Sequence, residues 1–284
     1  MKRIFDILNG WPIAYGKKKS GGVEELNKII ARTTEDDEAE AQHRSLLARM
    51  TGSVRDEGRM NLREVVGTSV TLGFAGTETM TTTLTGLVFN LSQNASAYET
   101  LLGEVRSAFD SEDEISLHST ARLEYLDACI KESMRVYPPA PQMPPRVCPG
   151  EFISGRYVPP KTLLSVFPWA TFRNPSHFVD AESFIPERWL SRHHPLFDPR
   201  FEQDNQSVFQ PFSYGSRDCL GKNLAYAVMR LVLTRFLFRF DYKADPGHMQ
   251  DGWQRQQRAH LVWATKPLFI RLEERKMDRK LTSS

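Results

Sequence analysis

The stretch Phe212-Ser-Tyr-Gly-Ser-Arg-Asp-Cys-Leu-Gly221 decides how this chain of 284 residues is interpreted. It places one cysteine, Cys219, in a tight loop with two glycines, directly before an apolar, helix-prone run over 221–240. Glycines let the backbone approach a flat macrocycle closely, and a helix N-terminus favours the thiolate form of a cysteine. The stretch therefore predicts that Cys219 is a thiolate ligand to heme iron. Such a ligand pushes electron density onto the iron and favours cleavage of the O–O bond of bound dioxygen.

Other roles for the cysteines stay open. Cysteine is among the most buried residue types, so Cys129 and Cys148 are expected to be structural, and Cys219 has the same alternative. A zinc site would need further ligands, but only His193-His194 offers adjacent histidines, and it stands far from Cys219 in the sequence. A cysteine nucleophile would need a partner histidine that the sequence does not single out. Three widely spaced cysteines indicate a reducing compartment rather than a disulfide scaffold.

The composition limits the classes of protein that fit. Hydrophobic residues make up 40% of the chain and charged residues 25%, as in an ordinary globular protein. A formal net charge of +2 gives no reason to expect nucleic-acid binding. No segment offers the roughly 18 consecutive apolar residues that a membrane span requires. The apolar start of the chain is interrupted by Asp6, Asn9 and Gly10, which argues against a signal peptide.

Hydrophobic periodicity predicts a chain that is rich in helices. Asn61 is a favoured cap for a long helix over 62–91, and no proline interrupts that stretch. The helix after Cys219 is apolar on both sides, which predicts that it is buried. Residues 1–60 are expected to form one or two surface helices, and 174–212 a loop-rich stretch. Further helices are predicted at 96–109 and 123–136, and strands at 152–158, at 162–167 and in two pieces within 261–272.

The long helix contains the polar segment Ala75-Gly-Thr-Glu-Thr79, whose residue types are poor for helix stability. They make sense where a helix must loosen beside a ligand, and the Thr79 hydroxyl can bind the Ala75 carbonyl four residues back and distort the helix. With Glu78 beside it, Thr79 would relay protons toward bound dioxygen. The alternative is a solvated polar patch on an ordinary helix.

Three charged positions predict a structural cluster. Glu132 and Arg135 stand three apart on one helix face, where a surface ion pair is the common interpretation. The apolar neighbours of this pair indicate a buried helix, and a buried pair needs more partners, for which Arg188 is the candidate. Arg146 lies in an extended segment from which it can reach a carboxylate, or it is simply a surface arginine.

Together these pieces resemble the cytochrome P-450 superfamily of heme-thiolate monooxygenases. The matches are in the family's order: the oxygen-activating segment of the long central helix at 75–79, the helix pair Glu132-x-x-Arg135, the segment Pro186-Glu187-Arg188 that completes a Glu-Arg-Arg triad, and the heme loop at 212–221. The resemblance covers about 62–272 and is most similar to microsomal members of fungal secondary metabolism, for instance in Pro186-Glu-Arg-Trp-Leu190.

The resemblance implies a cofactor, heme b, and a role for each motif residue. Cys219 would be the axial ligand of the iron, in a loop shaped by Gly215 and Gly221, with Phe212 packed beside the heme. The remaining roles are propionate pairing by Arg146 and Arg217, a structural triad of Glu132, Arg135 and Arg188, and a distal side lined by Ala75, Gly76, Glu78 and Thr79.

The implied fold is mainly α with small β-sheets, namely the C-terminal half of the cytochrome P-450 fold. Residues 1–60 would be a helical and loop remnant before the central helix, and 61–284 the heme-binding C-terminal portion of a single monooxygenase domain. Family members normally carry a substantial further N-terminal part with a membrane anchor. The resemblance therefore implies a C-terminal fragment, a truncated gene model or one half of a split protein.

The implied activity is insertion of one oxygen atom of O2 into a small apolar organic substrate, a secondary metabolite. Electrons would come from an NADPH-dependent flavoprotein reductase, whose acidic surface would meet Lys222 and Arg230. By resemblance the protein would lie on the cytosolic face of the endoplasmic reticulum membrane, although a chain without the anchor would be cytoplasmic. The alternative is a truncated, non-catalytic remnant that binds heme weakly or not at all.

Overall fold

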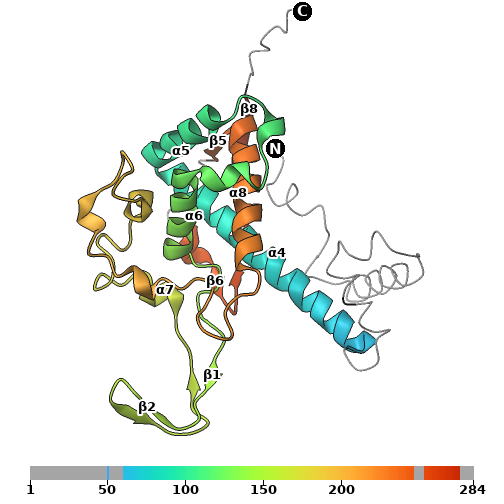
Figure 1. Ribbon diagram of the computed structural model, residues 1–284, viewed down its shortest axis with the longest axis vertical. Helices are drawn as coiled ribbons and strands as arrows, with labels where there is room; N and C mark the ends of the chain where they lie inside the picture. The colour runs from blue at the N-terminus through green and yellow to red at the C-terminus, as the bar shows by residue number, and fades with distance from the viewer. Residues whose placement is uncertain (1–49, 51–59, 246–252, 276–284) are drawn as a thin grey trace, which may run out of the picture. The chain divides into compact units, whose positions relative to one another are not determined.

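A computed structural model describes residue 50 and residues 60–245 and 253–275 of the chain (Figure 1). The surface helices expected within 1–60 lie outside the described residues, apart from the two positions Met50 and Met60. The described part of the chain forms two compact units, with the boundary between Thr77 and Glu78.

The first described element, helix α4, spans Leu62–Gln93 and crosses the sequence boundary between the units. Its start confirms the predicted cap. The Glu64 N–H donates to Asn61 Oδ1 at 3.0 Å, and the Asn61 N–H donates to Glu64 Oε2 at 2.8 Å, which is a reciprocal capping box. In this first unit Val65 is buried and packs with Met50.

The second unit has a helical core. It is built from α4 after Thr77, α5 (Ala95–Ala108), α6 (Glu124–Val136) and α8 (Lys222–Arg239), which gather in one part of the molecule (Figure 1). The predicted helices at 96–109 and 123–136 are thus confirmed to within one residue at each end. Their apolar stripes form one cluster, to which α5 contributes Leu101 and Val105 and α6 contributes Leu126 and Ile130. Helix α6 ends where Tyr137 precedes two prolines, because a residue before proline disfavours the helical conformation.

Four two-stranded antiparallel sheets occur in the described part of the chain. Their strands pair as β1 (Arg146–Val147) with β4 (Leu163–Leu164), β2 (Glu151–Ile153) with β3 (Arg156–Val158), β5 (Phe240–Ala244) with β8 (Ile270–Glu274), and β6 (Arg258–Ala259) with β7 (Trp263–Ala264). The single strand predicted at 152–158 is wrong, because the chain reverses at Ser154-Gly155, where both φ angles are positive, and forms a hairpin. The two strands predicted within 261–272 are present as β7 and β8.

The stretch over 174–212 is loop-rich, as predicted. Its regular structure consists of short 3-10 turns: η3 (Pro186–Trp189), η4 (Pro199–Phe201) and η5 (Gln206–Val208). Elsewhere the short elements are η1 (Glu112–Glu114), η2 (Ser119–Arg122), α7 (Pro168–Thr171) and η6 (Gln254–Gln256). Loops of this kind depend on side chains for their shape, and here these include Glu132 and Arg135 of α6.

Burial is uneven along α8. Met229, Leu233 and Leu237 are buried in the core, but Leu224 in the first turn is 64% exposed, so the prediction of a fully buried helix is wrong for its N-terminal part. The C-terminal end is fixed by Arg106 of α5, whose Nε donates to the Leu237 carbonyl at 3.2 Å and whose Nη2 donates to the Phe240 carbonyl at 3.3 Å. These bonds satisfy carbonyl groups that a helix end leaves unpaired.

Candidate functional site

The loop that carries Cys219 is closed at its base by backbone hydrogen bonds. The Cys219 N–H donates to the Phe212 carbonyl at 2.8 Å, and the Asp218 N–H donates to the Gly215 carbonyl at 3.1 Å. Gly215 has a φ of +85°, a conformation that costs glycine little. The loop therefore holds Cys219 two residues before Gly221, the N-cap of α8.

The surroundings of Cys219 fit a flat apolar cofactor. Its side chain is exposed, in contrast to the buried Cys129 and Cys148. Leu220 is 93% exposed, and with Leu224 it presents apolar surface beside the thiol. Contiguous exposed apolar surface often marks a ligand-binding or interaction site. Within the described ranges, no group of three or more His, Cys, Asp and Glu side chains can hold a metal ion. A single sulfur suits an iron whose other ligands come from a macrocycle.

The other residues of the proposed heme loop lie around this thiol. Phe212 is half-buried, and its ring centroid lies 5.2 Å from that of Tyr226 on α8. A Cβ on Gly221 would lie 3.8 Å from the Cys219 Sγ, in ordinary van der Waals contact. Arg217 in the loop is exposed, as is Arg146 in β1. No carboxylate of the described residues pairs with either arginine, so both guanidinium groups are available to an anionic group.

The predicted distal residues fall on both sides of the unit boundary. Glu78 and Thr79 begin the second unit and are half-buried, and the Thr79 carbonyl accepts a hydrogen bond from Thr83 Oγ1 at 2.9 Å. Ala75 and Gly76 belong to the first unit, where Ala75 is exposed and a Cβ on Gly76 would meet nothing within 4 Å. The hydrogen bond from Thr79 to Ala75 and the distal arrangement stay predictions.

Glu132, Arg135 and Arg188 form one buried ionic cluster. The Glu132 carboxylate accepts from Arg135 Nε at 2.9 Å and Nη2 at 2.8 Å, and from Arg188 Nε at 3.1 Å. It also accepts from the Ile185 N–H and from the Trp189 indole N–H, each at 2.8 Å. The side chains of the three charged residues are 0% exposed. Five hydrogen bonds thus compensate the desolvation of this carboxylate.

The remaining groups of the two arginines bind the loop-rich stretch. Arg135 donates to three backbone carbonyls, those of Phe172 at 2.9 Å, Ala181 at 2.6 Å and Ser183 at 2.7 Å. Arg188 donates to the Val179 carbonyl at 2.9 Å and pairs with a buried Asp204. Two cations and two carboxylates therefore balance inside the protein. We call Glu132, Arg135, Arg188, Trp189 and Asp204 the Glu132 cluster.

Sequence reasoning missed two members of this cluster. Asp204 stands 16 residues after Arg188 in a loop without periodic pattern, so no signal pointed to it. Trp189 was within reach, because a buried indole N–H usually has a hydrogen-bond partner and the adjacent residue is Arg188.

The Glu132 cluster is connected to the loop of Cys219. The Trp189 ring lies 4.6 Å from the Phe209 ring, measured between centroids, and Phe209 also packs on Phe172 at 5.1 Å. Gln206 Nε2 donates to the Arg188 carbonyl at 3.1 Å. The segment that leads into the loop is thus held by the cluster directly before Phe212.

A family model described as Cytochrome P450 matches residues 2–272 of the chain. The chain belongs to the cytochrome P450 family. The helix-rich structure with its small antiparallel sheets is consistent with this family.

Relatives of this P450 include fungal proteins. "Cytochrome P450 monooxygenase tpeC" of Talaromyces stipitatus is 42% identical over 224 residues, which are 78% of this chain and 43% of that protein. "Cytochrome P450 monooxygenase cpaH" of Aspergillus oryzae is 38% identical over 223 residues, 78% of this chain and 42% of that protein. "Cytochrome P450 monooxygenase dtxS2" of Metarhizium robertsii is 39% identical over 237 residues, 81% and 45% of the two chains. The chain spans less than half the length of these relatives.

A second ionic contact in this P450 joins α6 to α8. Arg230 of α8 pairs with Asp127 of α6, and Lys131 Nζ lies 2.9 Å from Asp127 Oδ2. Arg230 therefore already has a carboxylate partner within the protein, and its contact with an acidic reductase stays a prediction. Burial raises the pKa of Asp127, but the hydrogen bonds and charges of Lys131 and Arg230 outweigh it and hold the pKa below its ordinary value.

We expect the stability of this P450 to fall in acid partly through Asp127. A carboxyl whose pKa is lower in the folded than in the unfolded state stabilises the fold above its unfolded pKa. That contribution is lost as the pH falls through the folded pKa. Asp127→Asn should therefore lower the unfolding midpoint in urea at pH 7 but much less at pH 3, relative to the unchanged protein. An equal loss at both pH values would contradict the ion pair as the cause; Asp110→Asn, at an exposed position, serves as control.

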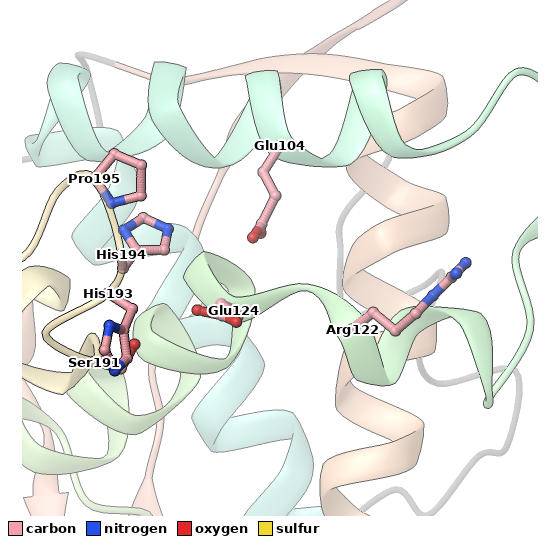
Figure 2. Close-up of a pocket in the computed structure, with 7 residues that line it drawn as sticks. All are labelled: Glu104, Arg122, Glu124, Ser191, His193, His194 and Pro195. Carbon is pink, nitrogen blue, oxygen red and sulfur yellow. The ribbon is translucent and has the colours of Figure 1, made fainter.

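A surface pocket of about 320 Å³ lies between α5, η2, the start of α6 and the loop after η3 (Figure 2). Its lining residues are Glu104, Arg122, Glu124, Ser191, His193, His194 and Pro195. Burial raises the pKa of Glu104, and the N–H groups of Tyr125 and Leu126 with the nearby His194 offset part of that rise.

Across the residues that the structure describes, no helix of this P450 combines the length and the apolar character that a membrane crossing needs.

Proposed function

We propose that the whole protein is a heme-thiolate monooxygenase, which inserts one oxygen atom of O2 into a small apolar substrate of fungal secondary metabolism. The observation that carries this proposal is the exposed Cys219 in a loop closed onto Phe212 at the start of α8. The fungal relatives that are named monooxygenases support it.

The heme loop and two arginines would hold the cofactor. Heme b supplies the activation of dioxygen when it is bound through the Cys219 thiolate. The N-terminal end of α8 would stabilise that thiolate, since unpaired N–H groups there favour negative charge. Phe212, with Gly215 and Gly221, would shape the contact surface. Arg146 and Arg217 would pair with the two propionates, because both are exposed and without a carboxylate partner in the described residues.

Glu78 and Thr79 would manage protons on the distal side. The Thr79 hydroxyl would hold a proton at Oγ1, and the Glu78 carboxylate would resupply it from solvent. Ala75 and Gly76, which carry little side-chain volume, are proposed as distal residues on the family resemblance alone. This role favours oxygen activation over a heme-thiolate isomerisation, which needs no proton relay.

The electron donor that we propose is an NADPH-dependent flavoprotein reductase. Lys222, which is exposed at the first position of α8, would meet acidic residues of that partner. Residence on the cytosolic face of the endoplasmic reticulum is proposed on the family resemblance alone.

The decisive experiment is the absorption spectrum of the full chain supplied with heme, reduced and saturated with carbon monoxide. We expect the red-shifted Soret band of a thiolate-ligated heme, and its loss in Cys219→Ser. Cys148→Ser is the matched control, because Cys148 is buried and lies outside the heme loop, so its band should remain. A chain that takes up no heme, or that shows the band of a neutral ligand, would favour the non-catalytic alternative.

A further inference from the structure

The N-terminus of α6 is capped by a residue from another helix. The N-cap position is Leu123, which has no side-chain group to bind the free N–H groups of the first turn. Glu104 of α5 replaces it: Oε1 accepts from the Tyr125 N–H and Oε2 from the Leu126 N–H, both at 2.8 Å. Figure 2 shows the Glu104 side chain reaching from α5 toward this turn. The helix dipole also stabilises a negative charge at this end of α6.

The same turn is bound to η3 by a side chain. The Tyr125 hydroxyl donates to Glu187 Oε1 at 2.7 Å, and Glu187 directly precedes Arg188. Tyr125 is 1% exposed, and its burial and the Glu187 hydrogen bond raise the pKa of the phenol, so it remains a donor. Glu104, Tyr125 and Glu187 thus link α5, α6 and η3, and we call them the Glu104 bracket.

The bracket and the Glu132 cluster hold η3 at two separate places. Tyr125 lies seven residues, or about two helical turns, before Glu132 on the same face of α6. Glu132 binds Arg188 and Trp189 from the C-terminal half of α6, and Tyr125 binds Glu187 from its first turn. The two attachments together define the orientation of η3 along α6. That orientation sets the position of Trp189, and with it Phe209 and the segment that enters the Cys219 loop.

We propose that Glu104 and Tyr125 are positioning residues that act through η3 and Phe209 to hold the Cys219 loop in the geometry of a heme ligand. The part of this proposal that concerns heme ligation rests on the proposed function. Its mechanical part, the effect of the bracket on the order of the Cys219 loop, concerns the protein alone. Neither residue lies in the heme loop or in the Glu132 cluster.

The test compares Glu104→Gln and Tyr125→Phe with two matched controls. Glu124→Gln changes a neighbouring carboxylate that lines the same pocket but is exposed. Tyr98→Phe removes a hydroxyl of α5 that accepts from the Tyr242 N–H of β5 at 3.2 Å, away from η3. Tyr125→Phe removes a single oxygen atom, so it keeps the proposal testable if Glu104→Gln does not fold.

Hydrogen–deuterium exchange of the full chain without heme is the first measurement. We expect the peptide over 206–219 to exchange about fivefold faster in both variants, the size of effect that loss of a helix cap has on local opening. Exchange over 146–158, whose strands pair with β4 and with each other, should stay unchanged, as should 206–219 in both controls. Unchanged exchange over 206–219 in both variants, or an equal rise over 146–158, would overturn the proposal.

The spectrum of the heme-loaded, reduced and carbon-monoxide-bound chain is the second measurement. We expect the share of heme with the thiolate band to fall at least about twofold in both variants, in favour of a neutral-ligand band, and to hold in the controls. If the unchanged protein lacks the thiolate band while exchange over 206–219 still rises, the proposed function fails and the mechanical part stands. Variants with accelerated exchange but full thiolate ligation would show that the bracket does not position the ligand.

Discussion

Replacing Glu132 with glutamine is expected to lower the free energy of unfolding by about 3–5 kcal/mol, the cost of breaking a buried ion pair by removing one partner. Glu132 accepts five hydrogen bonds, from Arg135, Arg188, Trp189 and the Ile185 N–H. A glutamine offers one acceptor oxygen and directs its NH2 group at other donors. The buried Arg135 would then have no carboxylate partner, and Arg188 would keep only Asp204. Urea unfolding followed by circular dichroism measures the loss.

The matched control for this substitution is Glu182→Gln. Glu182 pairs with Arg173, but its side chain is 67% exposed. Exposed pairs are worth less than about 1 kcal/mol. Similar losses in the two variants would show that burial does not set the energy of the Glu132 cluster.

Gly86→Ala is expected to cost about 1–3 kcal/mol, in the range of overpacked cores, despite the better helix propensity of alanine. A Cβ on Gly86 of α4 would lie 2.5 Å from Tyr137 Cδ1. The Tyr137 ring has no room to retreat, because it is fully buried and stacks on Trp263 at 5.3 Å with Trp253 at 5.6 Å. The glycine thus permits the close approach of α4 to the chain after α6. Thermal and urea unfolding give the loss.

Gly103→Ala is the same substitution at another helical position, but it is expected to stabilise the fold. Gly103 lies inside α5, and a Cβ there meets nothing within 4 Å. Alanine should stabilise this position by about 0.5–1 kcal/mol. A second check introduces Gly86→Ala into a Tyr137→Leu variant. There Gly86→Ala should lower the free energy of unfolding by less than it does in the unchanged protein. Additive losses would mean that the ring is not what Gly86 accommodates.

The helices of this P450 were predictable from local pattern. α4 was expected over 62–91 and ends at Gln93, and α8 was expected over 221–240 and spans Lys222–Arg239. Long periodic stretches with a cap such as Asn61 carry their own signal. The pairing of Arg146 with Leu164 could not be predicted from the sequence. A two-residue strand is too short to show a periodic pattern, and this pair joins positions that are distant in the sequence.

The ionic site was predictable in its pairs but not in its surroundings. The spacing of Glu132 and Arg135 on a helix indicates contact whether or not the helix is buried. Burial, the carboxylate of Asp204 and the cap from Glu104 all depend on how distant loops and helices meet. The exposed start of α8 was missed for a related reason, since an apolar sequence does not reveal which partner covers it.

The two ends of α8 differ in how far they are buried. Arg106 binds its last carbonyls, and Leu237 is buried there, whereas Leu220 and Leu224 at the other end are exposed. A ligand that covers the exposed end binds the folded chain and not the unfolded one, so it stabilises the fold in proportion to the logarithm of its concentration. The amount of folded protein in a cell would then follow the supply of that ligand, which makes cofactor availability a determinant of abundance as well as of activity.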